Sequence, residues 1–317
     1  MEQANEASAS QKPVWFITGC STGFGRHLAE CALARGYSVV VTARNLDSVK
    51  DFENSDSALI LQLDVTDEGQ IAAAISTALD KFGHIDVLVN NAGIGYLGAI
   101  EESEEFQVRK MFDVNVFGLS RMVRAVLPSM RKRRKGFIVN FSSVAGLRAF
   151  PALGFYSATK FAVEAVTEAL WQEVEPLGIK VMLVEPGGFR TQWLNSVNES
   201  AEQIDDYAET AGMWRNRLHT IADSQPGDPV RAALAILAVV DSCNPPHRLL
   251  LGKDALDRVN EKLNDVRKDL CCWESVSRSA DFPRPKLAQV PMIPRQGSVS
   301  PSSINPSSIN PSQASIN

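Results

Sequence analysis

The chain has 317 residues, a length that fits about two domains or one large α/β domain. Hydrophobic residues make up 44% and charged residues 22%, which excludes a collagen-like chain and a wholly disordered one. Lys and Arg number 32 against 37 Asp and Glu, so the formal net charge is −5. Because no basic surplus is present to neutralise phosphates, we do not expect a primary role in binding nucleic acid.

Targeting and redox features of the sequence point to the cytoplasm. The apolar run 232–240 is much shorter than the ~20 residues of a membrane helix, so no membrane span is expected. The polar segment 1–12 lacks the apolar core of a signal peptide, and the five cysteines show no CxxC spacing. The four histidines are scattered and predict no metal site. We therefore expect a cytoplasmic protein with reduced thiols.

Seven short apolar runs alternate with longer amphipathic stretches along residues 13–255. Runs of this length with few charges are typical of strands buried on both faces. They lie at 14–17, 38–41, 58–61, 87–89, 137–139, 181–184 and 248–251. Between 112 and 126, apolar residues recur at spacings of four and three, which predicts one long helix. Strands that alternate with helices predict a single α/β domain with a parallel sheet and helices on both faces.

The segments outside that domain differ in composition. We expect a flexible N-terminus over 1–12 and a helical extension over 256–280. Residues 281–317 hold seven Pro and eight Ser, and so little apolar surface cannot offset the chain entropy that folding removes, which predicts a disordered tail. The dense basic run 131–135 is interpreted as the solvated end of a helix, with a nuclear-import signal as the alternative.

A glycine-rich turn follows the first predicted strand. Gly19, Gly23 and Gly25 form a GxxxGxG pattern between that strand and an amphipathic helix. Glycines at this place let the backbone approach a ligand closely, and the start of the helix directs free N–H groups at a diphosphate. The turn therefore predicts a dinucleotide site, although glycines also serve plain tight turns.

Polar residues follow the next three predicted strands. Arg44 stands where an acidic residue would bind the adenosine ribose and repel a 2′-phosphate. A guanidinium pairs with that phosphate, which favours NADP over NAD; the alternative is a solvated loop arginine. Asp64 suits either a hydrogen bond to the adenine amino group or a cap of the next helix. The turn 91–93 (Asn-Ala-Gly) lies where ligands bind in such sheets.

Tyr156 and Lys160 are the main catalytic candidates. Their spacing places both on one face of a helix, about one turn apart. A phenol has a pKa near ~10, and a nearby ammonium lowers it because it favours the phenolate. The hydroxyl of Ser143, at the end of a strand, suits a hydrogen bond to a substrate carbonyl or a plain cap. Asn115 is a poor helix-interior residue, which suggests a polar role or an amide paired with backbone.

Taken together, these motifs resemble those of the short-chain dehydrogenase/reductase family in order and spacing. The resemblance covers residues 14 to about 255. It rests on Thr18-Gly-x3-Gly-x-Gly25, Asn91-Ala-Gly93, Asn115, Ser143, Tyr156-x3-Lys160 and Pro186-Gly187. It implies a single Rossmann-type, doubly wound sheet of seven strands in the order 3-2-1-4-5-6-7. It also implies NADP preference, because Arg44 stands at the position that marks such members.

The resemblance further implies roles for the motif residues. Tyr156 would be the general acid/base, and Lys160 would lower its pKa and hold the nicotinamide ribose. Ser143 would polarise the substrate, and Asn115 would hold a water that relays protons. The implied contacts of NADP(H) are Thr18, Gly19, Ser21, Gly23, Phe24, Gly25, Arg44, Asp64, Asn91, Ala92, Gly93, Tyr156, Lys160, Phe189 and Thr191. Dimers or tetramers of the family usually form through the helices after the fourth and fifth strands.

Substrate choice is expected to depend on the loop 190–225. Its residues Trp193, Tyr207, Met213 and Trp214 suggest a lipophilic small molecule such as a ring ketone, aldehyde, polyketide or terpenoid alcohol. The alternative is that these residues only pack a lid onto the domain.

Arg190, Arg215 and Arg217 in the same loop leave room for an acidic substrate, and 208–219 is expected to be a helix. The sequence as a whole predicts an NADP(H)-dependent oxidoreductase that acts on a carbonyl or a secondary alcohol. The alternative is a catalytically silent protein that senses nicotinamide cofactors on the same fold.

Overall fold

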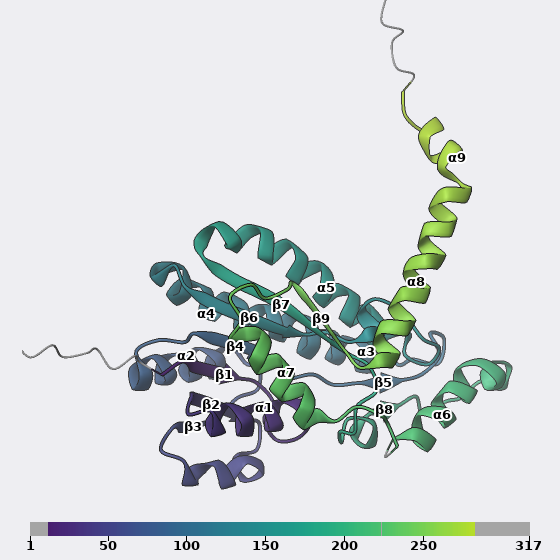
Figure 1. Cartoon of the computed structure of the whole chain (residues 1–317). Helices are drawn as coiled ribbons and strands as arrows, with labels where there is room; N and C mark the ends of the chain where they lie inside the picture. Colours follow the sequence, from purple (N-terminus) through teal and green to yellow (C-terminus); the bar gives the residue numbers. More distant parts are fainter. Residues whose placement is uncertain (1–11, 223, 283–317) are drawn as a thin grey trace, which may run out of the picture. The chain divides into compact units, whose positions relative to one another are not determined.

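Seven parallel strands form one sheet in the order β3-β2-β1-β4-β6-β7-β9 (Figure 1). The computed structural model describes residues 12–222 and 224–282. The strands of this sheet are β1 (Val14–Ile17), β2 (Ser38–Ala43), β3 (Ala58–Gln62), β4 (Val87–Asn90), β6 (Gly136–Phe141), β7 (Ile179–Pro186) and β9 (Arg248–Leu251). Counted within this sheet, the order is 3-2-1-4-5-6-7, so the Rossmann-type prediction is confirmed. Two short strands, β5 (Tyr96–Leu97) and β8 (Asn198–Glu199), pair separately.

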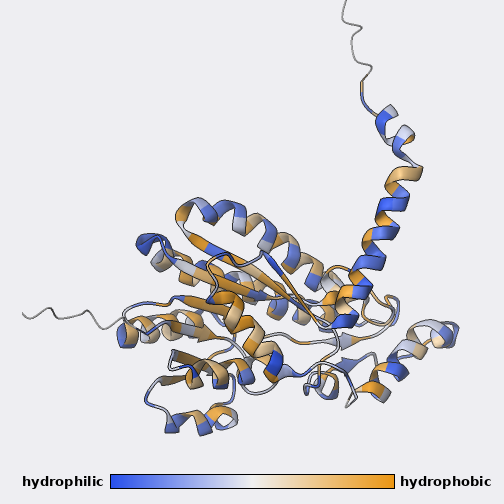
Figure 2. Cartoon of the chain, in the orientation of Figure 1, coloured by the Kyte–Doolittle hydropathy of each residue, from blue (hydrophilic) through white to orange (hydrophobic). Residues whose placement is uncertain are grey.

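Helices cover both faces of the sheet. On one face, α1 (Gly23–Ala34) and α7 (Pro229–Val240) share a buried apolar cluster with the strands. On the other face, α2 (Glu68–Phe82), α4 (Leu119–Arg133) and α5 (Gly154–Val174) share a second cluster. Figure 2 shows mostly hydrophobic colours along the strands and α7, and alternating hydrophobic and hydrophilic colours along α5.

Strand β1 shows why the apolar runs become central strands. All of its residues are at most 2% exposed. Trp15 and Ile17 belong to the cluster under α1 and α7, whereas Phe16 belongs to the cluster under α2, α4 and α5. Because such a strand is buried on both faces, apolar side chains are needed at every position rather than at alternate ones.

The long helix predicted over 112–126 is interrupted. Helix α3 spans Glu105–Phe112, a π-helical turn spans Asp113–Gly118, and α4 follows directly. A π-helical turn inserts one extra residue into a helix and is frequent at functional sites. Asn115 lies in this turn and is buried.

Several elements after β7 lie near the carboxyl ends of the strands. The helix predicted over 208–219 is a π-helical turn, Ala208–Gly212, followed by α6 (Met213–Ile221). Short 3-10 turns occur both before and after β7. Those before it span Leu46–Asn54, Val144–Gly146 and Glu175–Leu177, and those after it span Leu194–Ser196 and Asp205–Tyr207. After β9 come α8 (Lys253–Cys272) and α9 (Glu274–Ser279).

The described part of the chain divides into two units, one up to residue 269 and one from residue 270. Most of the predicted flexible N-terminus (1–12) and of the predicted tail (281–317) lies outside the described residues. Among the helices that the structure describes, none has the length and apolar content to cross a membrane.

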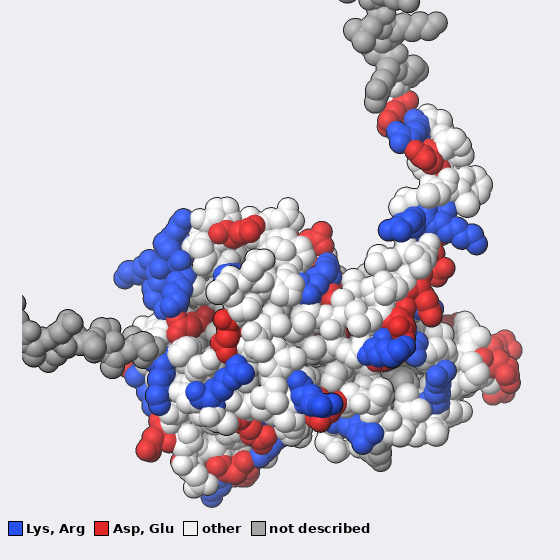
Figure 3. Space-filling model, viewed as in Figure 1, with Lys and Arg blue, Asp and Glu red and all other residues white. Residues whose placement is uncertain are grey.

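The basic run 131–135 lies where α4 ends. Four of its five residues are exposed, and Figure 3 shows a dense group of Lys and Arg over this end of the helix. Arg133 is half-buried and pairs with Asp86 at 3.0 Å. The prediction of a solvated helix end is therefore confirmed.

Candidate active site

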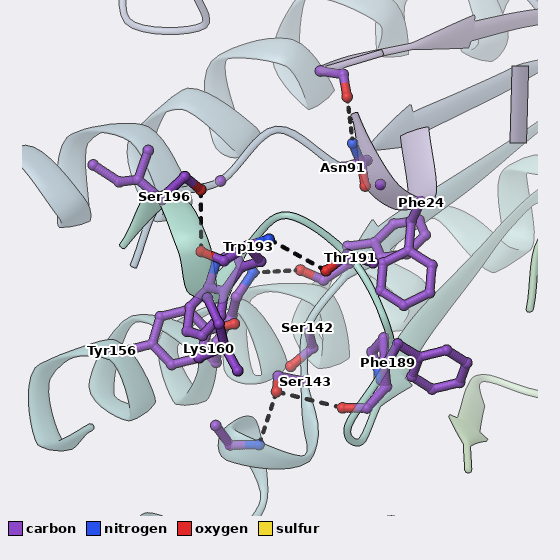
Figure 4. Close-up of a pocket in the computed structure, with 18 of the residues that line it drawn as sticks. Phe24, Asn91, Ser142, Ser143, Tyr156, Lys160, Phe189, Thr191, Trp193 and Ser196 are labelled. Carbon is purple, nitrogen blue, oxygen red and sulfur yellow. Dashed lines mark hydrogen bonds between the residues drawn. The ribbon is translucent and has the colours of Figure 1, made fainter. Parts of the chain in front are cut away.

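The carboxyl ends of the parallel strands open into a cleft of about 380 Å³. Ligands of doubly wound sheets bind at this edge, and the volume lies in the range of ligand pockets. Most of the predicted site residues line the cleft (Figure 4). They are Gly19, Ser21, Gly23, Phe24, Arg44, Asp64, Asn91, Ala92, Gly93, Ser143, Tyr156, Lys160, Phe189 and Thr191. Thr18, Gly25 and Asn115 lie behind its wall.

The glycine-rich turn between β1 and α1 forms one wall. Gly19 and Gly23 have φ values of 73° and 60°, a left-handed conformation that favours glycine. Gly25 serves close packing, because a methyl group there would lie 2.4 Å from both Asn91 Nδ2 and the Gly19 carbonyl oxygen. The side chain of Thr22 does not cap α1, which leaves the first N–H groups of this helix for a ligand.

Thr18 and Asn91 join the ends of β1 and β4. Thr18 Oγ1 donates to the Val89 carbonyl at 3.2 Å and accepts from the backbone N–H groups of Asn91 and Ala92, both at 3.0 Å. Asn91 Nδ2 donates to the carbonyls of Thr18 and Gly19, both at 2.9 Å. Because Thr18 is 1% exposed, it positions these two turns and does not face the cleft itself.

Tyr156, Lys160 and Ser143 meet at the cleft, the first two from α5 and the third after β6 (Figure 4). Lys160 Nζ lies 5.8 Å from the centre of the Tyr156 ring and donates to the Phe141 carbonyl at 2.8 Å. Ser143 Oγ accepts from the Ala145 N–H at 3.1 Å. Its own hydrogen bond to the Pro186 carbonyl is long, 3.5 Å, so this hydroxyl is weakly held.

The pKa of Tyr156 differs from the value that the sequence led us to expect. Burial raises the pKa of Tyr156 to about 12, and the hydrogen bond with Ser143 opposes that rise only in part. Burial also lowers the pKa of Lys160 to about 8, which the charge of Glu164 opposes. The sequence led us to expect a lowered pKa for Tyr156; in the folded chain burial disfavours the phenolate, and the net shift is upward.

Asn115 uses its whole amide group to bind the chain. Its Oδ1 accepts from the Ile94 N–H at 2.8 Å, and its Nδ2 donates to the Ile94 carbonyl at 2.9 Å and to Thr159 Oγ1 at 3.1 Å. A methyl group on Gly93 would lie 3.2 Å from Asn115 Oδ1 and 3.8 Å from Lys160 Nζ. The π-helical turn therefore brings Asn115 to the back of the same space that Lys160 borders.

The residues expected at the adenosine end are placed by the ends of β2 and β3. Arg44 is exposed and makes no ion pair with any residue that the structure describes. Asp64 accepts from the N–H and the hydroxyl of Thr66 at 2.9 and 2.7 Å. The cap of α2 is Asp67, whose side chain accepts from the Gln70 N–H, so the alternative role of Asp64 as that cap is wrong.

The segment 190–225, here called the lid, brings apolar side chains to the cleft. The ring of Trp193 lies 4.9 Å from that of Tyr156, and the ring of Trp214 lies 5.5 Å from that of Phe150. Met213, which was expected beside Trp214, does not line the cleft, and the residue is 54% exposed. The periodicity of the sequence could not show that Trp214 lines the cleft and that its neighbour Met213 does not.

The three arginines predicted in the lid have different roles. Arg215 is buried, and its Nη2 pairs with Glu102 Oε2 at 2.6 Å. Arg190 Nε donates to the Gln225 carbonyl at 2.6 Å. Of the three, Arg217 alone lines the cleft, where Arg258 from α8, outside the predicted loop, joins it.

Comparison with known proteins agrees with this geometry. A family model described as short chain dehydrogenase matches residues 13–202. The chain belongs to the short-chain dehydrogenase/reductase family. The resemblance seen in the motifs is thus confirmed over the glycine-rich turn, the Asn91 turn and the Tyr156–Lys160 helix.

Curated relatives of this family member are oxidoreductases. An oxidoreductase named BOA17 of Botryotinia fuckeliana is 36% identical over 77% of this chain and 90% of its own. A 3-ketodihydrosphingosine reductase of Bacteroides thetaiotaomicron is 39% identical over 76% of this chain and 88% of its own. The protein is therefore an oxidoreductase of the short-chain dehydrogenase/reductase family.

Several solved structures resemble this chain, and some of them contain a nicotinamide cofactor. A short-chain dehydrogenase of Streptomyces avermitilis is 43% identical, with a TM-score of 0.79 over 86% of this chain and 100% of its own. A family member of Burkholderia phymatum, 25% identical with a TM-score of 0.72 over 82% and 95%, contains NAD. The protein ElxO, 30% identical with a TM-score of 0.65 over 78% and 99%, contains NADP.

The cleft of this short-chain dehydrogenase fits such a dinucleotide. A methyl group on Gly23 would already be 3.5 Å from the side chain of Thr191, so glycine keeps the passage between these turns open. The buried Oδ1 of Asp254 lines the cleft without a hydrogen-bond partner among the described residues, and thus offers an acceptor. The free N–H groups at the start of α1 suit a diphosphate.

Sequence reasoning missed a buried acidic cluster behind Lys160. Glu164 on α5 and Glu185 on β7 share Arg248 Nη1, and Glu168 binds Arg248 Nη2 at 3.0 Å. Burial raises the pKa of Glu164 and, helped by the charge of Glu164, raises that of Glu185 to about 7. The one signal in the sequence was Glu185 inside an apolar strand, where a charge is costly.

Proposed function

We propose that the protein is an NADP(H)-dependent oxidoreductase that interconverts a carbonyl and a secondary alcohol. The observation that carries the proposal is the convergence of Tyr156, Ser143 and Lys160 at one wall of the cleft. Bound at the glycine-rich turn, the cofactor would supply or accept the hydride. The residues of the chain then hold the substrate and move its proton.

Each side chain has a role that its surroundings support. Ser143 Oγ, weakly held by the Pro186 carbonyl, turns to donate a hydrogen bond to the substrate oxygen. Tyr156, with a pKa of about 12, is protonated at neutral pH and donates a proton to that oxygen in the reduction. Lys160 has a pKa of about 8, so its ammonium is largely present at pH 7 and stabilises the phenolate that results.

Replacement of Tyr156 tests this mechanism. Tyr156→Phe removes the acid and keeps the ring against Trp193, so we expect turnover to fall by about 10²–10⁴-fold while NADPH affinity changes little. Tyr207→Phe is the matched control, because that phenol bonds Glu101 outside the cleft. The assay is NADPH oxidation with a panel of ketones and aldehydes. A Tyr156→Phe variant with near wild-type turnover would exclude the proposed acid.

Arg44 supports the choice of NADP. Its guanidinium lines the cleft next to the end of β2 and has no carboxylate partner among the described residues. We expect Arg44→Ala to raise the KM for NADPH by at least about tenfold, the value of one charge-assisted hydrogen bond, and to leave the KM for NADH nearly unchanged. Arg35→Ala, at the far end of α1, is the control. Equal changes for both cofactors would contradict the assignment.

The apolar wall of the cleft supports a lipophilic substrate. This wall combines lid residues with residues before β7, and such walls bury most of a small organic ligand. Its members are Phe150, Leu153, Trp193, Trp214 and Leu218. The relative of Bacteroides thetaiotaomicron is named a reductase of 3-ketodihydrosphingosine, a ketone. A ring ketone, long-chain ketone or aldehyde therefore belongs at the head of the substrate panel.

We also propose that the protein acts in the cytoplasm as a dimer or tetramer. The helices after β4 and β6 expose large apolar side chains, including Phe117 at 55%, Phe161 at 43% and Val166 at 40%. Covering such side chains favours association, and this is the face predicted from the family resemblance. Light scattering of the native protein gives its mass and tests this.

A further inference from the structure

The lid side of the cleft carries two arginines that the proposed reaction does not use. Arg217 comes from α6 and Arg258 from α8, and both line the cleft. The guanidinium carbon of Arg217 lies 5.4 Å from the centre of the Trp214 ring, and that of Arg258 lies 5.9 Å from the same centre. The two cations therefore border one patch of the wall and can be no farther apart than the sum of those distances.

Neither guanidinium has a carboxylate partner among the residues that the structure describes. Other arginines of this region are paired, Arg215 with Glu102 at 2.6 Å and Arg148 with Glu261 at 2.5 Å. Two like charges beside one ring repel each other, and a cation–π contact compensates for this only modestly. An anion bound to both would remove the repulsion.

The acidic residues of the cleft are placed elsewhere. Within the described residues they are Asp64, which binds Thr66 after β3, and Asp254, whose Oδ2 accepts from the Gly188 N–H at 3.1 Å. Asp254 lies one helical turn before Arg258 on α8, but its Oδ2 faces the end of β7 and it forms no ion pair with Arg258. Among the described residues, no carboxylate of the cleft therefore pairs with either guanidinium group.

Apolar groups surround the two arginines. Arg258 also lies 5.2 Å from the centre of the Phe150 ring, which packs on Trp214 at 5.5 Å, and Leu218 belongs to the same wall. A ligand here meets hydrocarbon along its length and two guanidinium groups at one place. Arg217 is exposed and Arg258 is half-buried, so water reaches the guanidinium groups in the free protein. A neutral lipid on this wall would displace some of that water and supply no counter-charge, whereas an amphipathic anion would supply one.

We infer that the substrate carries an oxyanion, a carboxylate or a phosphate, remote from the reacting carbon, and that Arg217 and Arg258 bind it. The inference rests on the proposed function and narrows its lipophilic substrate to an amphipathic acid. The apolar wall holds the hydrocarbon part, and the two guanidinium groups set the distance between the anionic end and the carbon that reacts beside Tyr156.

The first test compares matched substrates at saturating NADPH. A series of oxo acids of increasing chain length is assayed beside the methyl ester of each acid. We expect one length at which kcat/KM for the acid exceeds that for the ester by about tenfold or more, the effect of one charge-assisted hydrogen bond. Arg217→Met and Arg258→Met should bring this ratio toward one. Lys253→Met is the control, because Lys253 lies on α8, pairs with Asp257 at 2.5 Å and does not line the cleft.

The second test measures binding without turnover. Calorimetric titration in the presence of NADPH compares decanoate and decyl phosphate with decanamide, at low and high salt. The inference is supported if either anion binds more tightly than decanamide and if salt and the Arg217→Met/Arg258→Met double variant both weaken that binding. Whichever anion binds more tightly shows whether the substrate carries a carboxylate or a phosphate. If the anions bind in this way but no oxo acid or ester is reduced, the proposed reaction is refuted and the proposed anion site is still supported.

Two outcomes would overturn the inference. In the first, neither anion binds more tightly than the amide. In the second, the arginine variants raise the KM for NADPH but keep the acid-to-ester ratio, which would assign both guanidinium groups to the cofactor. Reduction of neutral ketones in either case would leave the proposed function intact.

Discussion

Glu185 offers a stability test that the sequence alone would not suggest. It is 0% exposed on β7, its Oε1 binds Arg248 Nη1 at 2.6 Å, and its Oε2 has no hydrogen-bond partner among the described residues. Burial and the nearby Glu164 raise its pKa to about 7. Glu185→Gln keeps the shape and the acceptor for Arg248 and supplies an N–H donor toward Glu164.

The sign of the effect follows from proton linkage. Between pH 4.5 and about 7 the folded protein keeps a proton on Glu185 that the unfolded chain releases, so stability falls as the pH rises. At about 1.36 kcal/mol per pH unit, the penalty reaches at most roughly 3 kcal/mol above pH 7. Glutamine carries no such penalty. We therefore expect Glu185→Gln to be more stable than the wild type by less than about 1 kcal/mol at pH 5 and by up to roughly 3 kcal/mol at pH 8.

Urea unfolding at pH 5, 6, 7 and 8, at one protein concentration, measures the difference. Glu168→Gln is the control, because the Glu168 side chain binds the same Arg248 but is 55% exposed, and its loss should change stability by less than about 1 kcal/mol at every pH. A difference between Glu185→Gln and wild type that stays constant with pH, or a variant less stable at pH 8, would refute this reasoning.

Two further substitutions probe the walls of the cleft. Gly25→Ala would place its methyl group 2.4 Å from the Gly19 carbonyl oxygen, so we expect weaker cofactor binding and a lower melting temperature. Gly36→Ala is the comparison, because a methyl group there meets open space and only the φ of 83° strains the backbone. Unchanged NADPH binding by Gly25→Ala would contradict the packing role. Glu102→Gln removes the nearer counter-charge of the buried Arg215 and leaves only Glu199, whose Oε2 lies 3.9 Å from Arg215 Nε. We expect this change to loosen the lid, which faster proteolysis within 190–225 would show. Equal cleavage rates would mean that the Arg215–Glu102 pair does not hold the lid.

The sheet could be predicted because its physical cause is local. Strands buried on both faces, such as β1, need an unbroken apolar run, and that run is visible in the sequence. The same holds for the glycine-rich turn, where Gly19 and Gly23 adopt left-handed conformations. The catalytic pair could also be predicted, because Tyr156 and Lys160 are four residues apart and so lie one turn apart on the same face of a helix.

What could not be predicted depends on the third dimension. The π-helical turn at Asn115 preserves the apolar spacing of a long helix, so periodicity does not reveal it. Arg215 and Arg217 look alike in the sequence, yet one is buried against Glu102 and the other lines the cleft. The raised pKa of Tyr156 reflects its burial, which no spacing of residues reports.

The two sides of the cleft come mostly from different stretches of chain. The turns that would hold most of the dinucleotide lie at the ends of β1 to β4, whereas most of the lid-side wall comes from residues after β7, including Trp193, Trp214 and Arg258. Phe150, before β7, and Thr191, after it, are exceptions. Exchange of the stretch after β7 between homologues should therefore change the substrate preference most, while the glycine-rich turn and the Asn91 turn stay as they are. Chimeras joined just after Pro186 are the natural place to begin.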